Sequence, residues 1–201
     1  MNPLLLLAMT ATICSAAEGL VVEQDMASGG STRRVTIRVR GHHVRLDYGN
    51  GSSAIIDTDT KQVVTLYHHD AFAIIDRGDD ALREAVQLVH TNYAPPRQAP
   101  VMSSEKFGGY ECRISDWQWN HRRNAIWFAP TYPHAAQFAP FAEVLRSFHC
   151  SCLPALGTDG LALKTITGDV DTPLTVTLVS AKIQTIPDEI FEIPPNAKPR
   201  Q

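Results

Sequence analysis

The chain lacks a strong charge of either sign and a second long hydrophobic run. Its 201 residues include 18 Lys and Arg against 21 Asp and Glu, and the isoelectric point is near 6.2. Such a balance provides no general field that would attract nucleic acid or an anionic membrane surface. Beyond the N-terminus, no stretch reaches the roughly 18 to 20 apolar residues that a membrane helix needs. We therefore expect no nucleic-acid partner and no transmembrane segment in the mature chain.

Motifs of the common catalytic chemistries are lacking as well. The chain has no Ser-His-Asp order and no close pair of carboxylates suited to acid–base catalysis. Gly29-Gly30-Ser31 is not followed by the Lys and the helix that a phosphate-binding loop requires. Gly41-His42-His43 opens a strand, whereas zinc proteases carry their histidines on a helix. These absences predict a protein that is not an enzyme and that has no metal site and no cofactor.

Cysteine is scarce, and the number that follows the N-terminal segment is odd. After Cys14 come Cys112, Cys150 and Cys152. In an oxidising compartment Cys112 is expected to pair with either Cys150 or Cys152, which leaves one thiol free. Either disulfide would close a loop of about 40 residues and stabilise the fold by about 3 to 4 kcal/mol. The cluster His149-Cys150-Ser151-Cys152 leaves open a second interpretation, a metal or thiol-redox site.

The N-terminus has the pattern of an export signal. An apolar run over residues 4–13 ends in the small side chains of Ser15-Ala16-Ala17. The run is too short to span a bilayer, and small side chains at this point suit a signal peptidase. The pattern predicts that residues 1–17 are removed before Glu18 and that residues 18–201 form one periplasmic domain. The alternative is an apolar N-terminal strand or helix.

Alternation of apolar and polar residues dominates the first part of the mature chain. In the clearest stretch Val35, Ile37 and Val39 alternate with Arg and Thr, which is the pattern of a strand with one solvated face. Turns rich in glycine, asparagine and aspartate separate segments of strand length. These segments predict an antiparallel meander with strands over residues 20–27, 33–40, 43–48, 53–57, 62–68 and 71–76.

The period changes to that of a helix after Asp79-Asp80. Apolar residues from Leu82 to Val89 recur at helical spacing, which predicts a helix over residues 80–92. The proline-rich segment 94–100 is expected to be an extended connector. The rest of the sequence predicts a second helix over 138–149 and strands over 110–114, 125–128, 160–168 and 173–185.

Several short motifs resemble those of a known family. The segment from Gly41 to Asp47 has a glycine and then an Arg-hydrophobic-Asp pattern at the start of a strand. The other matching segments are Ser53–Asp57, Val63–Tyr67, Gly109–Cys112, Ala125–Phe128 and Ile186–Pro194. Together with the order of the elements, they are similar to a bacterial domain family of unknown function that shares the half-barrel fold of the periplasmic lipoprotein carriers.

This resemblance implies an α+β fold that is mostly antiparallel β, a curved and incompletely closed half-barrel of about ten strands capped by two helices. The concave face of such a fold can hold acyl chains or another apolar ligand. The candidate lining residues on that face are Val35, Ile37, Val39, Leu46, Ile56, Leu66 and Trp127. The expected function is an exported, non-catalytic binding or carrier protein for a lipid or other apolar ligand in the cell envelope.

Another interpretation makes the same positions an ordinary filled core. The chain would then be a structural or interaction protein of the envelope, with a working surface near Trp117 and Trp119, which share one face of a strand. A basic stripe could also meet an anionic head group or an acidic partner, and it consists of Arg33, Arg34, Arg38, Arg40 and Arg45.

Two pairs of histidines are interpreted as solvated turn residues. His42-His43 and His68-His69-Asp70 both lie at expected turns of the meander. Adjacent side chains on a strand point to opposite faces, so neither pair is expected to converge on a metal ion.

Overall fold

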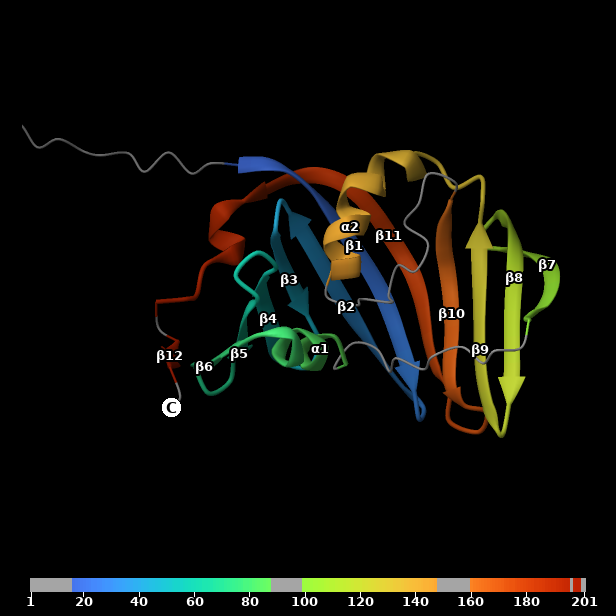
Figure 1. The fold of residues 1–201 in the computed structure, drawn as a ribbon, viewed down its shortest axis with the longest axis horizontal. Helices are drawn as coiled ribbons and strands as arrows, with labels where there is room; N and C mark the ends of the chain where they lie inside the picture. The colour runs from blue at the N-terminus through green and yellow to red at the C-terminus, as the bar shows by residue number, and fades with distance from the viewer. Residues whose placement is uncertain (1–15, 88–98, 148–159, 196, 200–201) are drawn as a thin grey trace, which may run out of the picture.

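A computed structural model describes residues 16–87, 99–147, 160–195 and 197–199. Twelve strands form one sheet in the order β12-β6-β5-β4-β3-β2-β1-β11-β10-β9-β8-β7 (Figure 1). Paired strands run antiparallel, except that the short β12 is parallel to β6. The described sheet is therefore open, with β12 at one edge and β7 at the other.

The strands are β1 (Ala16–Ser28), β2 (Ser31–Arg40), β3 (His43–Asp47), β4 (Ser52–Asp57), β5 (Gln62–Tyr67), β6 (Phe72–Arg77), β7 (Val101–Phe107), β8 (Tyr110–Trp119), β9 (Arg122–Ala129), β10 (Leu161–Asp169), β11 (Leu174–Pro187) and β12 (Lys198–Pro199). The helices are α1 (Asp79–Gln87), α2 (Ala139–Ser147) and the short 3-10 helices η1 (Ala135–Phe138) and η2 (Asp188–Phe191). The prediction of a mostly antiparallel, open β fold with two helices is confirmed at this level.

The strands β2 to β6 form the predicted meander. Along β2 the side chains of Val35, Ile37 and Val39 are fully buried, while those between them are partly exposed. The turn from β1 into β2 contains Gly29 and Gly30, with φ of 57° and 80°, a left-handed backbone that glycine adopts without a steric penalty. The tight turns place consecutive strands side by side, and the alternation directs successive side chains to opposite faces of the sheet.

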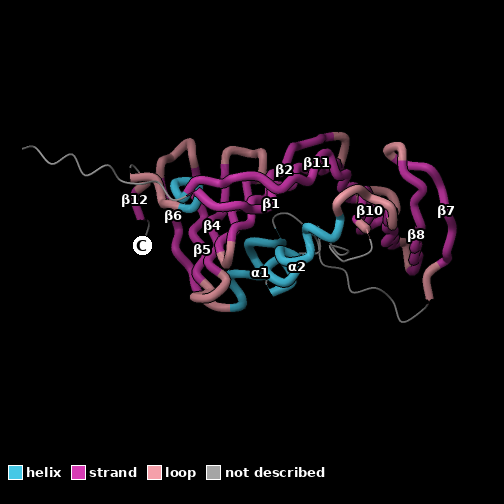
Figure 2. The backbone as a smooth tube through the Cα atoms, turned by 90° about the horizontal axis from the view of Figure 1, so that it is seen from above, coloured by secondary structure: helices cyan, strands magenta, loops and turns pink. Residues whose placement is uncertain are grey.

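The sheet is curved, and both helices lie in its hollow (Figure 2). We call the face toward α1 and α2 the inner face, and the opposite one the outer face. Helix α1 follows β6 and contacts β5 and β6, whereas α2 contacts β2. Neither helix in the described part of the chain has the length and apolar character needed to cross a membrane.

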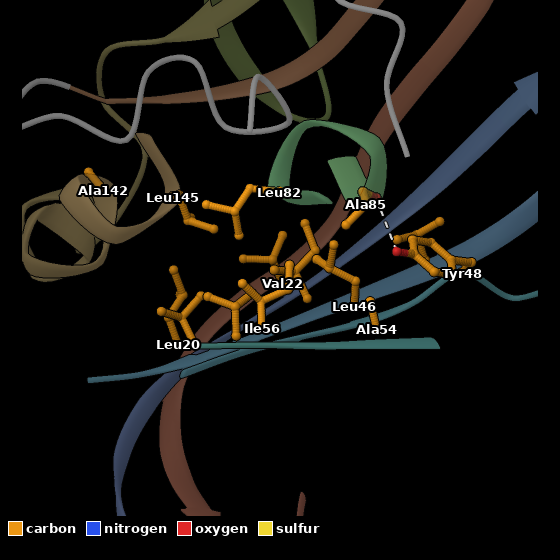
Figure 3. Packing of buried hydrophobic residues seen from close by; sticks show 14 of the residues in the cluster. Leu20, Val22, Leu46, Tyr48, Ala54, Ile56, Leu82, Ala85, Ala142 and Leu145 are labelled. Atoms are coloured by element: carbon orange, nitrogen blue, oxygen red, sulfur yellow. Dashed lines mark hydrogen bonds between the residues drawn. The ribbon is translucent and has the colours of Figure 1, made fainter. Parts of the chain in front are cut away.

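A packed core fills the space between the inner face of β1 to β4 and the two helices (Figure 3). Aliphatic strand side chains meet Leu82 of α1 and Leu145 of α2 there. Tyr48 is fully buried at the end of β3, and its hydroxyl donates a hydrogen bond to the Ala85 carbonyl oxygen at 3.0 Å. Because a buried polar group without a partner is costly, this bond ties α1 to the sheet.

The C-terminal segment folds back over the outer face. Arg40 donates to the Ile186 carbonyl oxygen at 2.7 Å and pairs with Asp188, and Arg45 donates to the Ile190 carbonyl oxygen at 3.0 Å. The side chain of Phe191 packs against a small outer cluster that consists of Ile55, Val64, Leu66 and Ala73. β12 then adds a last strand beside β6.

Several boundaries differ from the predicted ones. β1 begins at Ala16, within the predicted signal segment, because the ladder with β11 continues to Pro187. Strands β7 and β12 are absent from the prediction, and β8 continues to Trp119, beyond the predicted end at residue 114. The predicted ends of both long helices and most of the proline-rich connector lie outside the described residues.

Candidate functional site

Five of the predicted lining residues lie together on the inner face. They are Val35, Ile37, Val39, Leu46 and Ile56, and each side chain is 0% exposed in the core beneath α1 and α2. In this arrangement they support the helices, and none of the five lines either pocket described below. A direct contact between these residues and a ligand stays a prediction.

Leu66 lies on the other side of the sheet from these five residues. It belongs to the outer cluster that Phe191 covers. Val63, which is paired with Ile56, takes the inner position on β5 instead. The predicted place of Leu66 on the concave face is therefore wrong, because the run Val63-Val64-Thr65-Leu66 offers apolar side chains to both faces.

Trp127 lies in a second cluster, nearer the β7 edge of the sheet. The ladder pairs Trp127 with Lys164 and Lys164 with Thr177, the neighbour of the core residue Val176, so Trp127 and Val176 point to opposite faces and the predicted place of Trp127 on the concave face is wrong. Buried Cys112, Ile114, Ala125, Trp127, Ala129 and Leu163 form this cluster. The Lys164 ammonium is 4.6 Å from the centre of the Trp127 ring and 5.4 Å from that of Phe107. Arg123 lies 5.9 Å from the Trp127 ring centre and forms an ion pair with Asp116 at 2.7 Å. Two cations thus lie against the aromatic part of the second cluster, at distances typical of cation–π contacts.

A groove of about 420 Å³ lies between the two clusters. Tyr132, in the turn between β9 and η1, packs against both clusters. Its ring centre is 5.3 Å from that of Tyr110 and 6.4 Å from that of Phe138. The lining residues are Tyr110, Tyr132, Pro133, His134, Gln137, Phe138, Ala181, Lys182 and Ile183. Three aromatic rings and an aliphatic strand face thus form the apolar wall of the groove.

Polar groups lie at the rim of the same groove. His134 is exposed, and its carbonyl oxygen accepts a hydrogen bond from the Gln137 backbone N–H at 2.9 Å. Lys182 is also exposed and supplies a positive charge. Burial raises the pKa of Tyr132, whose hydroxyl can donate a hydrogen bond. An apolar wall with a few polar groups is the usual form of a small-molecule site.

Sequence reasoning does not identify this groove. Its residues come from four separate segments: the start of β8, the turn after β9, η1 and β11. No motif joins these segments, and Tyr132 falls in a turn that carries no periodic signal. The nearest signal is the alternation along β11, which places Ala181 and Ile183 on one face.

The predicted arginine stripe lies against carboxylates of the same chain. Arg34 forms an ion pair with Asp25 at 2.6 Å, and Arg38 and Arg45 both pair with Asp47. These pairs offset much of the positive charge that the outer face would present to an anionic head group or an acidic partner.

Trp117 and Trp119 lie near the end of β8, on the opposite face of that strand from Cys112 and Ile114. Both are half-buried, and they lie opposite Asn124 and Arg122 in the ladder. The two side chains lie on one face of β8, as predicted. Their contact with a partner protein stays a prediction.

The predicted disulfide lies only partly within the described residues. Cys112 is buried in the second cluster, and burial raises the pKa of its thiol. Cys150 and Cys152 lie outside the described residues. The disulfide, and the metal or redox alternative at these two cysteines, therefore stay predictions.

His42 and His43 lie side by side, so the prediction that they point to opposite faces is wrong. His42 belongs to the turn that follows Gly41, and His43 is the first residue of β3. Because the turn interrupts the strand alternation, the two ring centres are 4.0 Å apart. Burial, followed by the neighbouring His42, lowers the pKa of His43. With Asp57 they form the only group of three or more His, Cys, Asp or Glu side chains in the described part of the chain whose potential ligand atoms lie close enough together to hold a metal ion.

Comparison with known proteins relates the chain to solved structures alone. No protein-family model matches the sequence, and no curated protein matches it. The structure of an uncharacterized conserved protein from Thermus thermophilus is similar at a TM-score of 0.54 and 7% identity, over 90% of this chain and 89% of that one. Two crystal forms of PNGF-II align with TM-scores of 0.42 at 14% and 12% identity, over 92% of this chain and 31% of theirs. The similarity to the Thermus protein concerns the fold alone.

Proposed function

We propose that the chain acts after export as a non-catalytic binding or carrier protein for an apolar ligand, such as a lipid acyl chain. The observation that carries this proposal is the groove between the two clusters, with its wall of Tyr110, Tyr132, Phe138 and Ile183. Its volume of about 420 Å³ falls within the range of small-molecule sites, about 300 to 1,000 Å³. The curved open sheet and the resemblance to the half-barrel of the periplasmic lipoprotein carriers support the same function.

The groove suits a ligand with a long apolar part and a polar end. Each methylene removed from water contributes about 0.8 kcal/mol, so that eight methylenes against the aromatic wall would contribute about 6 kcal/mol before the costs of association. His134, Gln137 and Lys182 at the rim would face the polar end of the ligand. Such a division of roles requires no reaction and no cofactor.

The test is a binding measurement on protein exported to the periplasm and purified without detergent. Native mass spectrometry detects a co-purified ligand, and the mass of the denatured chain shows whether it begins at Glu18. A fluorescent fatty acid is then titrated into the delipidated protein. Ala181→Trp fills the groove from β11, and Gln137→Trp covers its rim from an exposed position. Both variants are expected to weaken binding about tenfold or more, since each removes contact area from the ligand.

The matched control is Val179→Trp. Val179 lies on the same strand, is 43% exposed and is not part of the groove lining. This variant adds comparable bulk and is expected to bind like the wild type. Equal affinity in all three variants, with unchanged melting temperatures, would show that the ligand does not bind in the groove.

One observation favours a second candidate, an envelope protein that works through its surface near Trp117 and Trp119. The five inner residues that were expected to line a pocket are fully buried in a filled core. In that case the exported protein carries no lipid and takes up none. Trp117→Ala and Trp119→Ala would then abolish capture of a partner from envelope extracts, while Gln137→Trp would leave capture unchanged.

A further inference from the structure

A second cluster of chemically active side chains lies away from the groove, where two turns of the meander meet. His42 lies in the turn between β2 and β3, and His43 is paired with Asp57 across the β3–β4 ladder. One potential ligand atom from each of these three residues lies within 4.8 Å of the others. A metal ion about 2.0 to 2.2 Å from each donor requires them slightly closer together, which small side-chain rotations achieve.

Hydrogen bonds hold the backbone around this cluster. The backbone N–H and the hydroxyl of Thr58 both donate to the His42 carbonyl oxygen, each at 3.0 Å. Oδ1 of Asp57 accepts hydrogen bonds from the backbone N–H groups of Asp59 at 3.0 Å and Thr60 at 3.1 Å. The two turns are thus joined to each other before any ion binds. A site that is already ordered loses little conformational entropy when it binds an ion.

The surroundings also favour a cation. Asp59 Oδ2 lies 3.5 Å from His42 Nδ1, so a second carboxylate is close to the three donors. A pocket of about 330 Å³ opens beside His42, and Glu143 of α2 lies in its wall. The nearby cation Arg40 forms an ion pair with Asp188. This pocket leaves room for water or a further ligand on an ion.

The packing of His43 orients its ring. The ring centre lies 5.7 Å from that of Phe191, on the segment that folds back over the outer face. Packing on this side and the His42 ring on the other limit the rotamers that His43 can adopt.

We propose that His42, His43 and Asp57 bind one divalent first-row transition-metal ion. Two imidazole nitrogens and one carboxylate oxygen are a donor set that suits zinc(II), copper(II) and nickel(II), and the carboxylates offset the charge of the ion. The bound ion would link the β2–β3 turn to β4. This site is independent of the groove and of the function proposed for it.

The test is a titration of the untagged full-length chain with zinc(II), after dialysis against a chelator. Isothermal titration calorimetry is expected to give one ion per chain. His42→Ala and His43→Ala are each expected to weaken zinc binding about tenfold or more, since each removes one ligand. Zinc is also expected to raise the melting temperature of the wild type, because an ion bound only by the folded state stabilises that state. It is not expected to raise the melting temperature of the double variant His42→Ala/His43→Ala.

His68 and His69 provide a matched control. They are also adjacent histidines followed by a carboxylate, Asp70, in an exposed turn of the same meander. The double variant His68→Ala/His69→Ala is expected to bind zinc like the wild type. Loss of affinity in this control, or wild-type affinity in the His42→Ala/His43→Ala variant, would overturn the proposal.

A measurement on the wild type avoids any effect of the substitutions on folding. The imidazole nitrogen NMR signals of His42 and His43 are expected to shift with the first equivalent of zinc, while those of His68 and His69 stay in place. Shifts confined to other histidines would exclude this site. Asp57→Asn retains an oxygen for the hydrogen bonds of the turn and is expected to weaken zinc binding without unfolding the chain.

Discussion

Tyr48 is a polar residue at the edge of an apolar core, and its hydroxyl joins a helix to the sheet. The side chain is 0% exposed, and the hydrogen bond to the Ala85 carbonyl oxygen is 3.0 Å long. Burial raises the pKa of Tyr48 well above its ordinary value of 10.0. Because the pKa of Tyr48 is higher in the folded than in the unfolded state, the stability of the fold depends on pH in the alkaline range.

Tyr48→Phe is expected to lower the free energy of unfolding by about 1 to 2 kcal/mol at neutral pH, because the Ala85 carbonyl oxygen loses its buried partner. Urea denaturation measures this change. Tyr67→Phe is the control, since the Tyr67 side chain is 37% exposed. A loss of the same size in both variants would contradict a special role for the Tyr48 hydroxyl.

The same residue predicts a loss of stability in alkali. Above pH 10 the unfolded chain releases the Tyr48 proton, while the folded chain retains it because its pKa is raised. The contribution of the neutral phenol is therefore complete below pH 10 and declines as the pH rises toward the pKa of the folded state. In Tyr48→Phe the decline in stability above pH 10 should be shallower than in the wild type.

At the scale of elements, the central strand β1 depends on a glycine. A Cβ atom at Gly19 would lie 2.5 Å from the Val39 carbonyl oxygen and 2.6 Å from Cδ1 of Ile186. Ile186 can adjust the end of its side chain, but the Val39 oxygen belongs to the ladder of β2. β1 can therefore lie between β2 and β11 at this point only while residue 19 has no side chain.

Gly19→Ala is expected to lower the free energy of unfolding by about 1 to 3 kcal/mol through overpacking, as measured by urea denaturation. Glu18→Ala is a control in the same strand, where an exposed side chain is shortened. Its expected effect is within about 0.5 kcal/mol. Equal stability of Gly19→Ala and the wild type would mean that β1 is free to move away from β2 at this position.

The elements differ in how well the sequence predicts them, and the reason is exposure. β2 alternates between buried and partly exposed side chains, so its period is visible in the sequence. β7 is exposed along nearly all its length and has no apolar period, so only its ladder with β8 defines it as a strand. The strand period misplaces Leu66 and the pair His42-His43, because it fails in a doubly apolar run and next to a turn.

The groove shows the same limit at the scale of the candidate site. A buried core selects apolar residues in a regular pattern, and the sequence shows that pattern clearly. A groove between two clusters is defined by where η1 and the turn after β9 meet β11, which depends on tertiary packing. The metal-ligand group likewise becomes visible only when Asp57 is placed beside His43 by the ladder.

At the scale of the whole molecule, part of the outer face is covered by the chain's own C-terminal segment. η2 brings Phe191 onto the cluster of Ile55, Val64, Leu66 and Ala73, and Arg40 and Arg45 bind the same segment. The covered strands therefore have apolar side chains on both faces, and their stability depends on a segment far along the chain.

Phe191→Ala is expected to lower the free energy of unfolding by about 2 kcal/mol or more, because it uncovers this outer cluster. Thermal denaturation and the binding of a hydrophobic dye both report the change. Ile193→Ala, at a side chain that is 40% exposed, is the control and should differ from the wild type by about 0.5 kcal/mol or less. Equal dye binding by both variants would show that Phe191 does not protect the cluster.

The place of β1 between β2 and β11 determines when the fold can be completed. β1 is made before the other strands and β11 after nearly all of them, yet the two are neighbours along nearly their whole length, with Ala16 opposite Pro187. The meander from β2 to β6 can form early from local contacts, whereas the two halves of the sheet join only after most of the chain has been synthesised. Pairing between such distant segments is slow. A chain of this topology therefore completes its sheet only after β11 has been made, so that any event during synthesis meets a chain whose two halves are still unjoined.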